Sequence, residues 1–229
     1  MAPIKMLALF FIVFKTSMKL KIHEIFHSLQ GESSRVGLPT VFVRLTGCPM
    51  RCVYCDTAYA FSGGSNIEIA DILAKVAEFS TPYVTVTGGE PLAQKDSLVL
   101  LRQLCDAGYS VSLETGGAID ISPVDKRVSV ILDVKTPGSG EEKNNLWENL
   151  SHLKATDEVK FVLCDYADYQ WAKQILTKYK LIEKCPVLFS PVYSQVNPTQ
   201  LAEWVLADKL PVRMQLQLHK ILWGEKPGV

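Results

Sequence analysis

Two hydrophobic patterns alternate along the chain. Short runs rich in β-branched and aromatic residues predict buried strands, and segments in which apolar residues recur every three or four positions predict amphipathic helices. The predicted strands cover 22–30, 40–45, 83–87, 109–115, 127–134, 158–164, 186–190 and 213–218. The predicted helices cover about 67–79, 95–107, 144–154, 167–180 and 198–208. Asn66 is expected to cap the first of these helices.

Strands and helices follow each other through most of the chain, and the connections between them are short and rich in Gly and Pro. This order is typical of βα units and predicts a mostly parallel sheet. About six or seven parallel strands are too few for a closed eight-stranded barrel. We therefore expect one α/β domain over residues 18–229, folded as a partial (β/α) barrel with about six parallel core strands.

Residues 1–17 differ from the rest of the chain. After Lys5 comes a run of nine apolar residues, Met6–Phe14. As a helix this run would be about 14 Å long, against roughly 30 Å of membrane hydrocarbon, and no small-residue cleavage site follows it. We expect these residues to be an N-terminal extension and Met18 to be the natural start, with a membrane-surface tail as the alternative.

The charge balance argues against a polyanionic partner. Lys plus Arg number 24 and Asp plus Glu also number 24, so the formal net charge is zero. Since no basic excess is available to neutralise phosphates, we expect a small-molecule substrate and neither nucleic acid nor membrane as a partner. Cys105, Cys164 and Cys185 lie far apart in the sequence and are expected to be buried as small apolar residues.

The other three cysteines form a C-x3-C-x2-C array. Cys48, Cys52 and Cys55 follow the predicted strand 40–45 and can bind one metal centre as thiolates. A structural zinc ion usually has four protein ligands, and no second cysteine pair occurs in the chain. Three ligands leave one position open for a substrate or cofactor. A partial zinc site and three unrelated buried cysteines remain as alternatives.

Two features accompany the cysteines. Tyr54 lies between the last two, and Thr87–Pro91 (Thr-Gly-Gly-Glu-Pro) ends the predicted strand 83–87. Together they resemble the radical S-adenosylmethionine (SAM) enzymes. The resemblance implies that the three thiolates hold a 4Fe-4S cluster, that SAM binds its fourth iron, and that reduction of SAM yields a 5′-deoxyadenosyl radical. It also implies Tyr54 near the adenine, a cytoplasmic location, and flavodoxin or ferredoxin as electron donor.

The same resemblance implies SAM contacts at the carboxyl ends of the predicted strands, where parallel β/α proteins gather their functional groups. Gly89 is expected to carry the amino group of SAM's methionine part through its backbone, with Glu90 in support. Glu114, Lys135 and Ser190 are expected at the ribose and the carboxylate. The complete predicted SAM set is Tyr54, Asp56, Gly89, Glu90, Glu114, Asp133, Lys135 and Ser190.

A narrower resemblance rests on segments spread over residues 18–229. They are Phe26–Glu32, Arg44, Cys55–Thr57, Thr87–Pro91, Asp133–Pro137 and Gln217–Lys220. These segments are similar to those of the 7-carboxy-7-deazaguanine synthase family. The resemblance implies conversion of 6-carboxy-5,6,7,8-tetrahydropterin to 7-carboxy-7-deazaguanine with loss of ammonia, in queuosine and 7-deazapurine synthesis. It also implies regenerated SAM, a Mg²⁺ requirement and a homodimer.

The resemblance implies a substrate site whose side chains suit a pterin. Gln30 can pair with an amide and amine edge, Arg44 offers a fork for a carboxylate, and Thr57 offers an oxygen to Mg²⁺. The predicted substrate set is Leu29, Gln30, Gly31, Glu32, Arg44 and Thr87, with Thr57 at Mg²⁺. Alternatively, Arg44 belongs to a surface ion pair and Thr57 caps a loop. The family commonly has glycine after Gln-Gly-Glu, so Ser33–Ser34 leaves the backbone path after Glu32 open.

Two other functions remain compatible with the cysteine loop. A glycyl-radical activating enzyme shares this loop and acts on a protein partner, although the segment Ser28–Glu32 speaks against it. A non-catalytic iron–sulfur or zinc module would cleave no SAM. His23, His27 and His219 are single histidines and are expected to be packed and hydrogen-bonded rather than to act as ligands.

Overall fold

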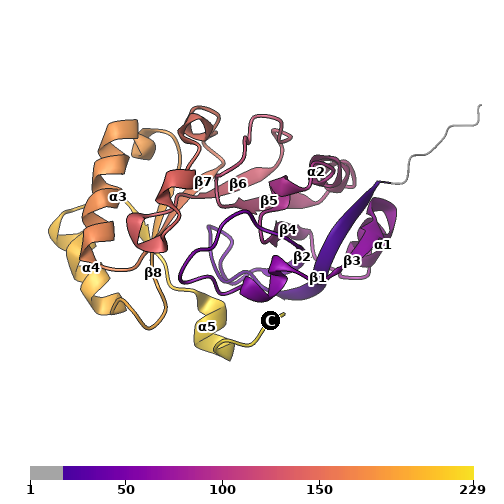
Figure 1. Cartoon of the computed structure of the whole chain (residues 1–229), viewed down its shortest axis with the longest axis horizontal. Helices are drawn as coiled ribbons and strands as arrows, with labels where there is room; N and C mark the ends of the chain where they lie inside the picture. Colours follow the sequence, from indigo (N-terminus) through magenta and orange to yellow (C-terminus); the bar gives the residue numbers. More distant parts are fainter. Residues whose placement is uncertain (1–17) are drawn as a thin grey trace, which may run out of the picture.

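The computed structural model describes residues 18–229, through which one nine-stranded sheet runs (Figure 1). The order of the strands is β3-β1-β2-β4-β5-β6-β7-β8-β9. Every neighbouring pair from β2 to β9 is parallel, whereas β1 is antiparallel to both β2 and β3. The α/β class and the open, mostly parallel sheet of a partial barrel are confirmed. The predictions about residues 1–17 lie outside the described residues.

The elements have the following bounds. The strands are β1 Lys19–Leu29, β2 Pro39–Leu45, β3 Ser65–Glu68, β4 Tyr83–Gly88, β5 Ser110–Thr115, β6 Ser129–Asp133, β7 Glu158–Leu163, β8 Val187–Pro191 and β9 Arg213–Met214. The α-helices are α1 Ile69–Ala77, α2 Ser97–Asp106, α3 Tyr166–Tyr179, α4 Pro198–Ala207 and α5 Leu218–Trp223. Short 3-10 turns cover Ala58–Phe61, Pro91–Ala93, Pro137–Ser139, Glu142–Asn144, Trp147–Ser151 and Leu181–Glu183.

The parallel strands have one apolar face and one polar face. In β7, Val159, Phe161 and Leu163 belong to the core that packs against the helices, whereas Lys160 lines a cavity on the other side. In β5, Leu113 belongs to the core and the next residue, Glu114, lines the cavity. Because successive strand residues point to opposite faces, each short strand supplies both the core and the cavity wall.

The predicted helix over 144–154 is wrong. Residues Glu142–Asn144 and Trp147–Ser151 form two separate 3-10 turns. The Asn149 side chain accepts from Ile121 N at 3.0 Å and donates to the carbonyl oxygens of Gly117 and Ile119 at 3.1 and 2.9 Å. Asn149 is fully buried, so these long-range bonds to the loop after β5 replace the local helix.

Two further expectations need correction. Asn66 caps no helix, because it lies in β3 opposite Lys21, and α1 begins after Glu68. The predicted strand 213–218 is shorter than expected, since β9 ends at Met214 and the next residues turn toward the loop after β1. The sequence pattern did not predict β3 or α5.

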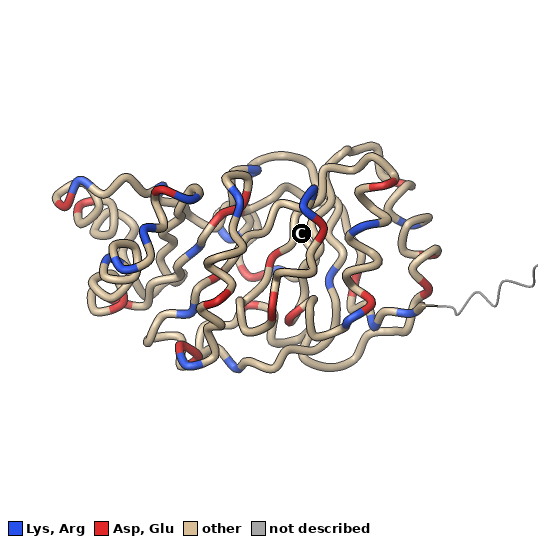
Figure 2. Tube along the Cα trace, turned by 90° about the horizontal axis from the view of Figure 1, so that it is seen from above, with Lys and Arg blue, Asp and Glu red and all other residues tan. Residues whose placement is uncertain are grey.

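The charges of the described chain are mixed. Figure 2 shows Lys and Arg interspersed with Asp and Glu along the trace. None of the helices within residues 18–229 combines the length and the apolar character that crossing a membrane requires.

Candidate active site

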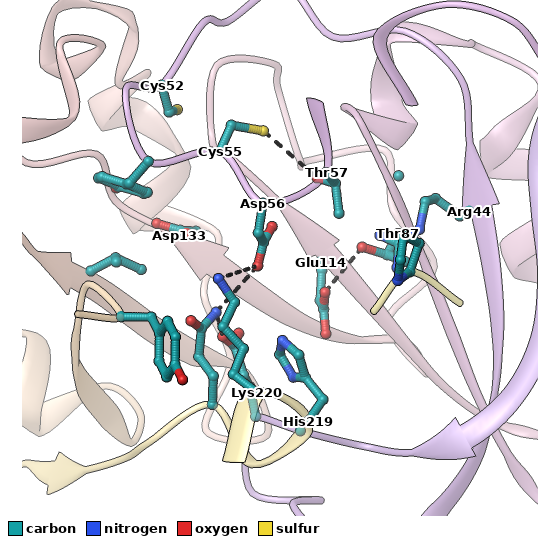
Figure 3. Close-up of a pocket in the computed structure, with 18 of the residues that line it drawn as sticks. Arg44, Cys52, Cys55, Asp56, Thr57, Thr87, Glu114, Asp133, His219 and Lys220 are labelled. Atoms are coloured by element: carbon teal, nitrogen blue, oxygen red, sulfur yellow. Dashed lines mark hydrogen bonds and ion pairs between the residues drawn. The ribbon is translucent and has the colours of Figure 1, made fainter. Parts of the chain in front are cut away.

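A cavity of about 640 Å³ opens at the carboxyl ends of the parallel strands (Figure 3). The cysteine loop forms one wall, and the segment from Gln217 to the C-terminus forms another. Every predicted site residue except Glu90 and Ser190 lines this cavity. Those that line it are Leu29, Gln30, Gly31, Glu32, Arg44, Cys48, Cys52, Tyr54, Cys55, Asp56, Thr57, Thr87, Gly89, Glu114, Asp133 and Lys135. The fold thus gathers residues from six separate segments around one space.

The cysteine loop presents its three thiols to the cavity. The loop is held by Gly47 N, which donates to Ala60 O at 2.9 Å, and by Val53 N, which donates to Ser139 O at 3.1 Å. Burial raises the pKa of the Cys52 thiol, and the neighbouring Lys135 ammonium opposes that rise. Burial also raises the pKa of Cys48. Lys135 therefore acts against burial and in favour of the thiolate, the form that binds metals.

The donor set fits a cluster better than a single ion. Within residues 18–229, no group of three His, Cys, Asp or Glu side chains is placed to hold one metal ion. A cluster makes a different demand, because each thiolate then binds its own iron. Thr57 Oγ1 lies 3.7 Å from Cys55 Sγ, so the residue predicted at Mg²⁺ sits directly beside the cysteine array.

The glycine turn after β4 packs directly under the cysteine loop. Gly89 N donates to Leu45 O at 3.1 Å, and Glu90 N donates to Gly47 O at 2.8 Å. A Cβ at Gly89 would collide with the Gly47 carbonyl and lie 2.9 Å from the Cys48 Cβ. Only glycine allows this close approach, and it leaves the Gly89 backbone open to the cavity.

Glu90 braces this turn from behind. It is fully buried, and its carboxylate accepts from Leu92 N at 3.0 Å, Gly116 N at 2.8 Å and Thr115 Oγ1 at 2.9 Å. Burial raises the pKa of Glu90, and these donors oppose the rise. The carboxylate therefore joins the turn to the end of β5. It does not face the cavity, so Glu90 supports the turn and makes no direct contact with a ligand in the cavity.

A second carboxylate, that of the half-buried Glu114, faces the cavity. Its Oε2 accepts from Thr87 Oγ1 at 3.0 Å, and its Oε1 accepts from Gln30 Nε2 at 3.2 Å. Burial raises the pKa of Glu114, whereas Lys160, Thr87 and Gln30 act in the opposite direction. Thr87 of β4, Glu114 of β5 and Gln30, which directly follows β1, form one polar wall with hydrogen-bond donors and acceptors side by side.

Lys160 links Glu32 to Asp133 across the site, and sequence reasoning missed it. Its Nζ lies 2.6 Å from Glu32 Oε2 and 3.3 Å from Asp133 Oδ2, and Lys135 Nζ lies 3.1 Å from the same Asp133 oxygen. Burial alone would raise the pKa of both carboxyls, but the lysines outweigh it and hold the pKa of Glu32 and of Asp133 below the usual values. For Lys160, the carboxylates outweigh burial and raise the pKa. The signal available was a lysine inside the otherwise apolar run 159–163.

The C-terminal segment supplies further residues to which sequence reasoning gave no role. Gln217 Nε2 donates to Glu32 Oε1 at 2.7 Å, and Lys220 Nζ lies 3.8 Å from Asp56 Oδ2 (Figure 3). His219 also lines the cavity, in contrast to the expectation of a packed residue, and burial lowers its pKa. The resemblance had included Gln217–Lys220, so the signal was present without an assigned function.

Three buried polar atoms near the cavity have no hydrogen-bond partner within residues 18–229. They are Tyr54 Oη, Asp133 Oδ1 and Ser190 Oγ. Burial also raises the pKa of Tyr54, so its hydroxyl stays protonated and able to donate. Buried polar groups are nearly always hydrogen-bonded in folded proteins, so these three unsatisfied atoms, in the cysteine loop and at the ends of β6 and β8, indicate a place for a polar ligand.

Arg44 has an ion-pair partner in the structure. Its Nε lies 2.7 Å from Glu24 Oε1, which also accepts from Tyr59 Oη at 2.8 Å. Its guanidinium carbon lies 5.5 Å from the centre of the Phe26 ring. Arg44 still lines the cavity, so the ion pair fixes a cation in the wall.

Comparison with known proteins gives matches over nearly the whole chain. The model of the radical SAM superfamily matches residues 42–135. The chain is 47% identical over 212 residues to the 7-carboxy-7-deazaguanine synthase of Chlorobaculum tepidum, covering 91% of this chain and 96% of that protein. It is 42% identical over 226 residues to the 7-carboxy-7-deazaguanine synthase of Koribacter versatilis, covering 92% and 100%.

Solved structures add a likeness of fold. The crystal structure of QueE from Escherichia coli matches with a TM-score of 0.72 over 88% of this chain and 95% of that chain. The sequences are 24% identical, so this likeness concerns the fold alone.

Proposed function

Because the chain belongs to the 7-carboxy-7-deazaguanine synthase family of radical SAM enzymes, we propose that it converts 6-carboxy-5,6,7,8-tetrahydropterin to 7-carboxy-7-deazaguanine with loss of ammonia. This lyase reaction is a step of queuosine and 7-deazapurine synthesis. One observation carries the proposal: the three thiols of the cysteine loop share a single cavity with a polar wall made of Gln30, Glu32, Glu114 and Thr87.

Radical SAM enzymes use a 4Fe-4S cluster and SAM, and Cys48, Cys52 and Cys55 are the residues proposed to hold the cluster. When bound, the cluster and SAM supply the radical that removes a hydrogen atom from the substrate. The chain's own contribution is to orient both ligands and to exclude water. Val53 of the loop is 70% exposed, whereas Cys52 and Cys55 on either side are half-buried.

The residues proposed to bind SAM surround the loop. Gly89 offers its backbone beside Cys48, and Lys135 brings a cation for a carboxylate. The unpartnered atoms of Tyr54, Asp133 and Ser190 support this assignment, since hydroxyls and a carboxylate suit the polar groups of a nucleoside and an amino acid. Asp56 and Glu114 complete the cavity-facing set, and Glu90 acts by holding the glycine turn in place.

The residues proposed to bind the pterin form the polar wall of the cavity, and Glu114 belongs to both sets. Glu32 and Glu114 offer acceptors for its amine and amide edge, and the Gln30 side chain lies between them. Thr87 orients Glu114. Arg44 offers a cation for the pterin carboxylate, and Leu29 and Gly31 line the remaining surface. Lys160 lies beside the carboxylates of Glu32 and Asp133 and offsets the repulsion between them.

Further parts of the proposal rest on the family resemblance. Thr57 would give an oxygen to Mg²⁺, a hard cation that prefers oxygen ligands. The chain would act as a homodimer in the cytoplasm and accept its electron from a flavodoxin or ferredoxin. A Mg²⁺ titration of turnover and a sedimentation measurement test the first two points.

The decisive experiment is an anaerobic assay with reconstituted cluster, a reductant, SAM and the carboxytetrahydropterin. We expect 7-carboxy-7-deazaguanine, detected by mass spectrometry. Cleavage of SAM to 5′-deoxyadenosine without this product would remove the proposed substrate and favour an enzyme that acts on a protein. No cleavage of SAM by a protein that holds its cluster would favour a non-catalytic module.

A further inference from the structure

The turn after β1 lies beside the segment 213–218, which begins with β9, and the two run in opposite directions. Successive residues of the turn 31–34 meet residues of the segment 213–218 in descending order. The contacts are Gly31 O with Leu218 N at 3.0 Å, Glu32 Oε1 with Gln217 Nε2 at 2.7 Å, Ser33 with Gln215, and Ser34 Oγ with Arg213 Nη1 at 3.4 Å. Only the first is a bond between backbone groups, so side chains of the C-terminal segment hold the turn.

Ser33 is the strained member of the turn. Its φ is 66°, in the left-handed region that glycine adopts easily and other residues adopt at a cost. This chain therefore keeps a glycine-like backbone path with a serine, and something else must hold it.

The Gln215 side chain hydrogen-bonds to both backbone groups of Ser33. Its Oε1 accepts from Ser33 N at 2.6 Å, and its Nε2 donates to Ser33 O at 2.8 Å. Ser33 is 1% exposed and Gln215 is 6% exposed, so water cannot easily replace either bond. Loss of the Gln215 side chain would leave the buried N–H of Ser33 without a partner, which proteins rarely tolerate, and Ser33 O would keep only the bond from Val36 N at 3.3 Å.

The strained residue directly follows Gln30–Glu32, which form part of the polar wall. Gln30 Nε2 donates to Glu114, and Glu32 is paired with Lys160. A rotation of the backbone at Ser33 would move Glu32 away from both the cavity and its ammonium partner. We propose that Gln215 is a positioning residue for the substrate site, one that holds Ser33 in the left-handed conformation and so directs Gln30 and Glu32 at the pterin.

The identity of the ligand in this inference rests on the proposed function, but the positioning of the turn does not. The first measurement is therefore hydrogen–deuterium exchange of the peptide 30–36 in cluster-loaded protein without pterin. In Gln215→Ala we expect exchange in this peptide to be faster by about tenfold, the effect of losing roughly one buried hydrogen bond. Gln200→Ala, which changes an exposed glutamine of α4, is the control and should leave the peptide unchanged.

The second measurement is steady-state turnover. In Gln215→Ala we expect KM for the carboxytetrahydropterin to rise about tenfold while kcat, iron content and SAM affinity stay within about twofold, because only the turn is released. If Gln215→Ala does not fold, Gln215→Glu serves instead, since it keeps the acceptor for Ser33 N and loses the donor to Ser33 O. An unchanged exchange rate in peptide 30–36 would overturn the inference.

A double-mutant cycle tests the role of strain. In a Ser33→Gly background the left-handed conformation needs no clamp, so Gln215→Ala should raise KM by much less than in the serine background. An equal rise in both backgrounds would overturn the role assigned to Ser33. If the wild-type enzyme makes no product, the proposed function fails, and the exchange measurement still decides whether Gln215 positions the turn.

Discussion

Two neighbouring regions at the carboxyl edge of the sheet handle buried polar groups in opposite ways. At the ends of β4 and β5, the Glu90 carboxylate accepts from Leu92 N, Gly116 N and the Thr115 hydroxyl. Near the ends of β6 and β8, Tyr54 Oη, Asp133 Oδ1 and Ser190 Oγ are buried without a partner within residues 18–229. The first region is completed by the chain itself, and the second is complete only when something else binds.

The difference separates structural from functional polarity. A buried group whose hydrogen bonds are all made stabilises the fold, whereas an unsatisfied one costs about 1–3 kcal/mol. Evolution retains such a cost mainly where a ligand removes it. The Glu90 region should therefore respond to mutation with a loss of stability, and loss of the unpartnered Tyr54 or Ser190 hydroxyl with a loss of ligand binding.

The largest expected effect comes from removing a cysteine beside the Tyr54–Asp133–Ser190 region. Cys52→Ala should abolish the iron–sulfur chromophore and all product formation, because two thiolates cannot replace three. Iron and sulfide analysis with anaerobic absorption spectra checks this outcome. Cys105→Ala, at a half-buried cysteine outside the cavity, is the control and should keep both. A fully loaded, active Cys52→Ala protein would disprove the assignment of the loop.

The next largest expected effect is on stability and concerns the Glu90 region. Glu90→Ala should lower the free energy of unfolding by roughly 2–4 kcal/mol, because it leaves buried N–H groups of Leu92 and Gly116 without an acceptor. Urea unfolding of the cluster-free protein measures the change. Glu78→Ala, at an exposed helix end, should change little. A loss in Glu90→Ala no larger than in Glu78→Ala would contradict the bracing role.

A smaller effect distinguishes two tyrosines. Tyr54→Phe removes a hydroxyl without a partner, so the free energy of unfolding should stay within about 0.5 kcal/mol, while SAM affinity of the cluster-loaded protein should fall about tenfold. Tyr59→Phe removes a hydroxyl that donates to Glu24 and should lower stability instead. Urea unfolding and equilibrium dialysis with SAM provide the two readouts. The comparison of regions would break down if both variants lost stability equally.

The smallest expected effect is a difference in pH dependence. The pKa of Asp133 is lowered, because Lys135 and Lys160 outweigh burial, so Asp133 stabilises the fold above its ordinary pKa near 3.8, and this contribution is lost as the pH falls through the folded value. The pKa of Glu90 is raised by burial, so its contribution is fully present below its ordinary pKa near 4.5 and is lost as the pH rises through the folded value.

Urea unfolding between pH 3 and 7 can follow both carboxyls. The advantage of wild type over Asp133→Asn should shrink on acidification, and its advantage over Glu90→Gln should grow. The same trend in both variants would show that the two carboxyls are not held in different ways.

Much of the fold and of the site was predictable from local sequence. The alternation of strands and helices predicted the parallel sheet, and the spacing of Cys48, Cys52 and Cys55 with Thr87–Pro91 predicted the family. Errors arose where distant contacts overrule local preference. The segment 144–154 has a helical pattern, but Asn149 bonds to the loop after β5 and replaces a helix by short turns.

The sequence by itself determined which residue types lie at the strand ends, because side chains alternate along a strand and cysteine spacing is a local property. Only the tertiary structure decided which of them form hydrogen bonds and ion pairs with one another. Lys160 meets Glu32 across 128 positions of the chain, and Gln215 meets Ser33 across 182. Such pairs leave no local pattern, since the free energy that selects them depends on burial and hydrogen bonding in the folded protein.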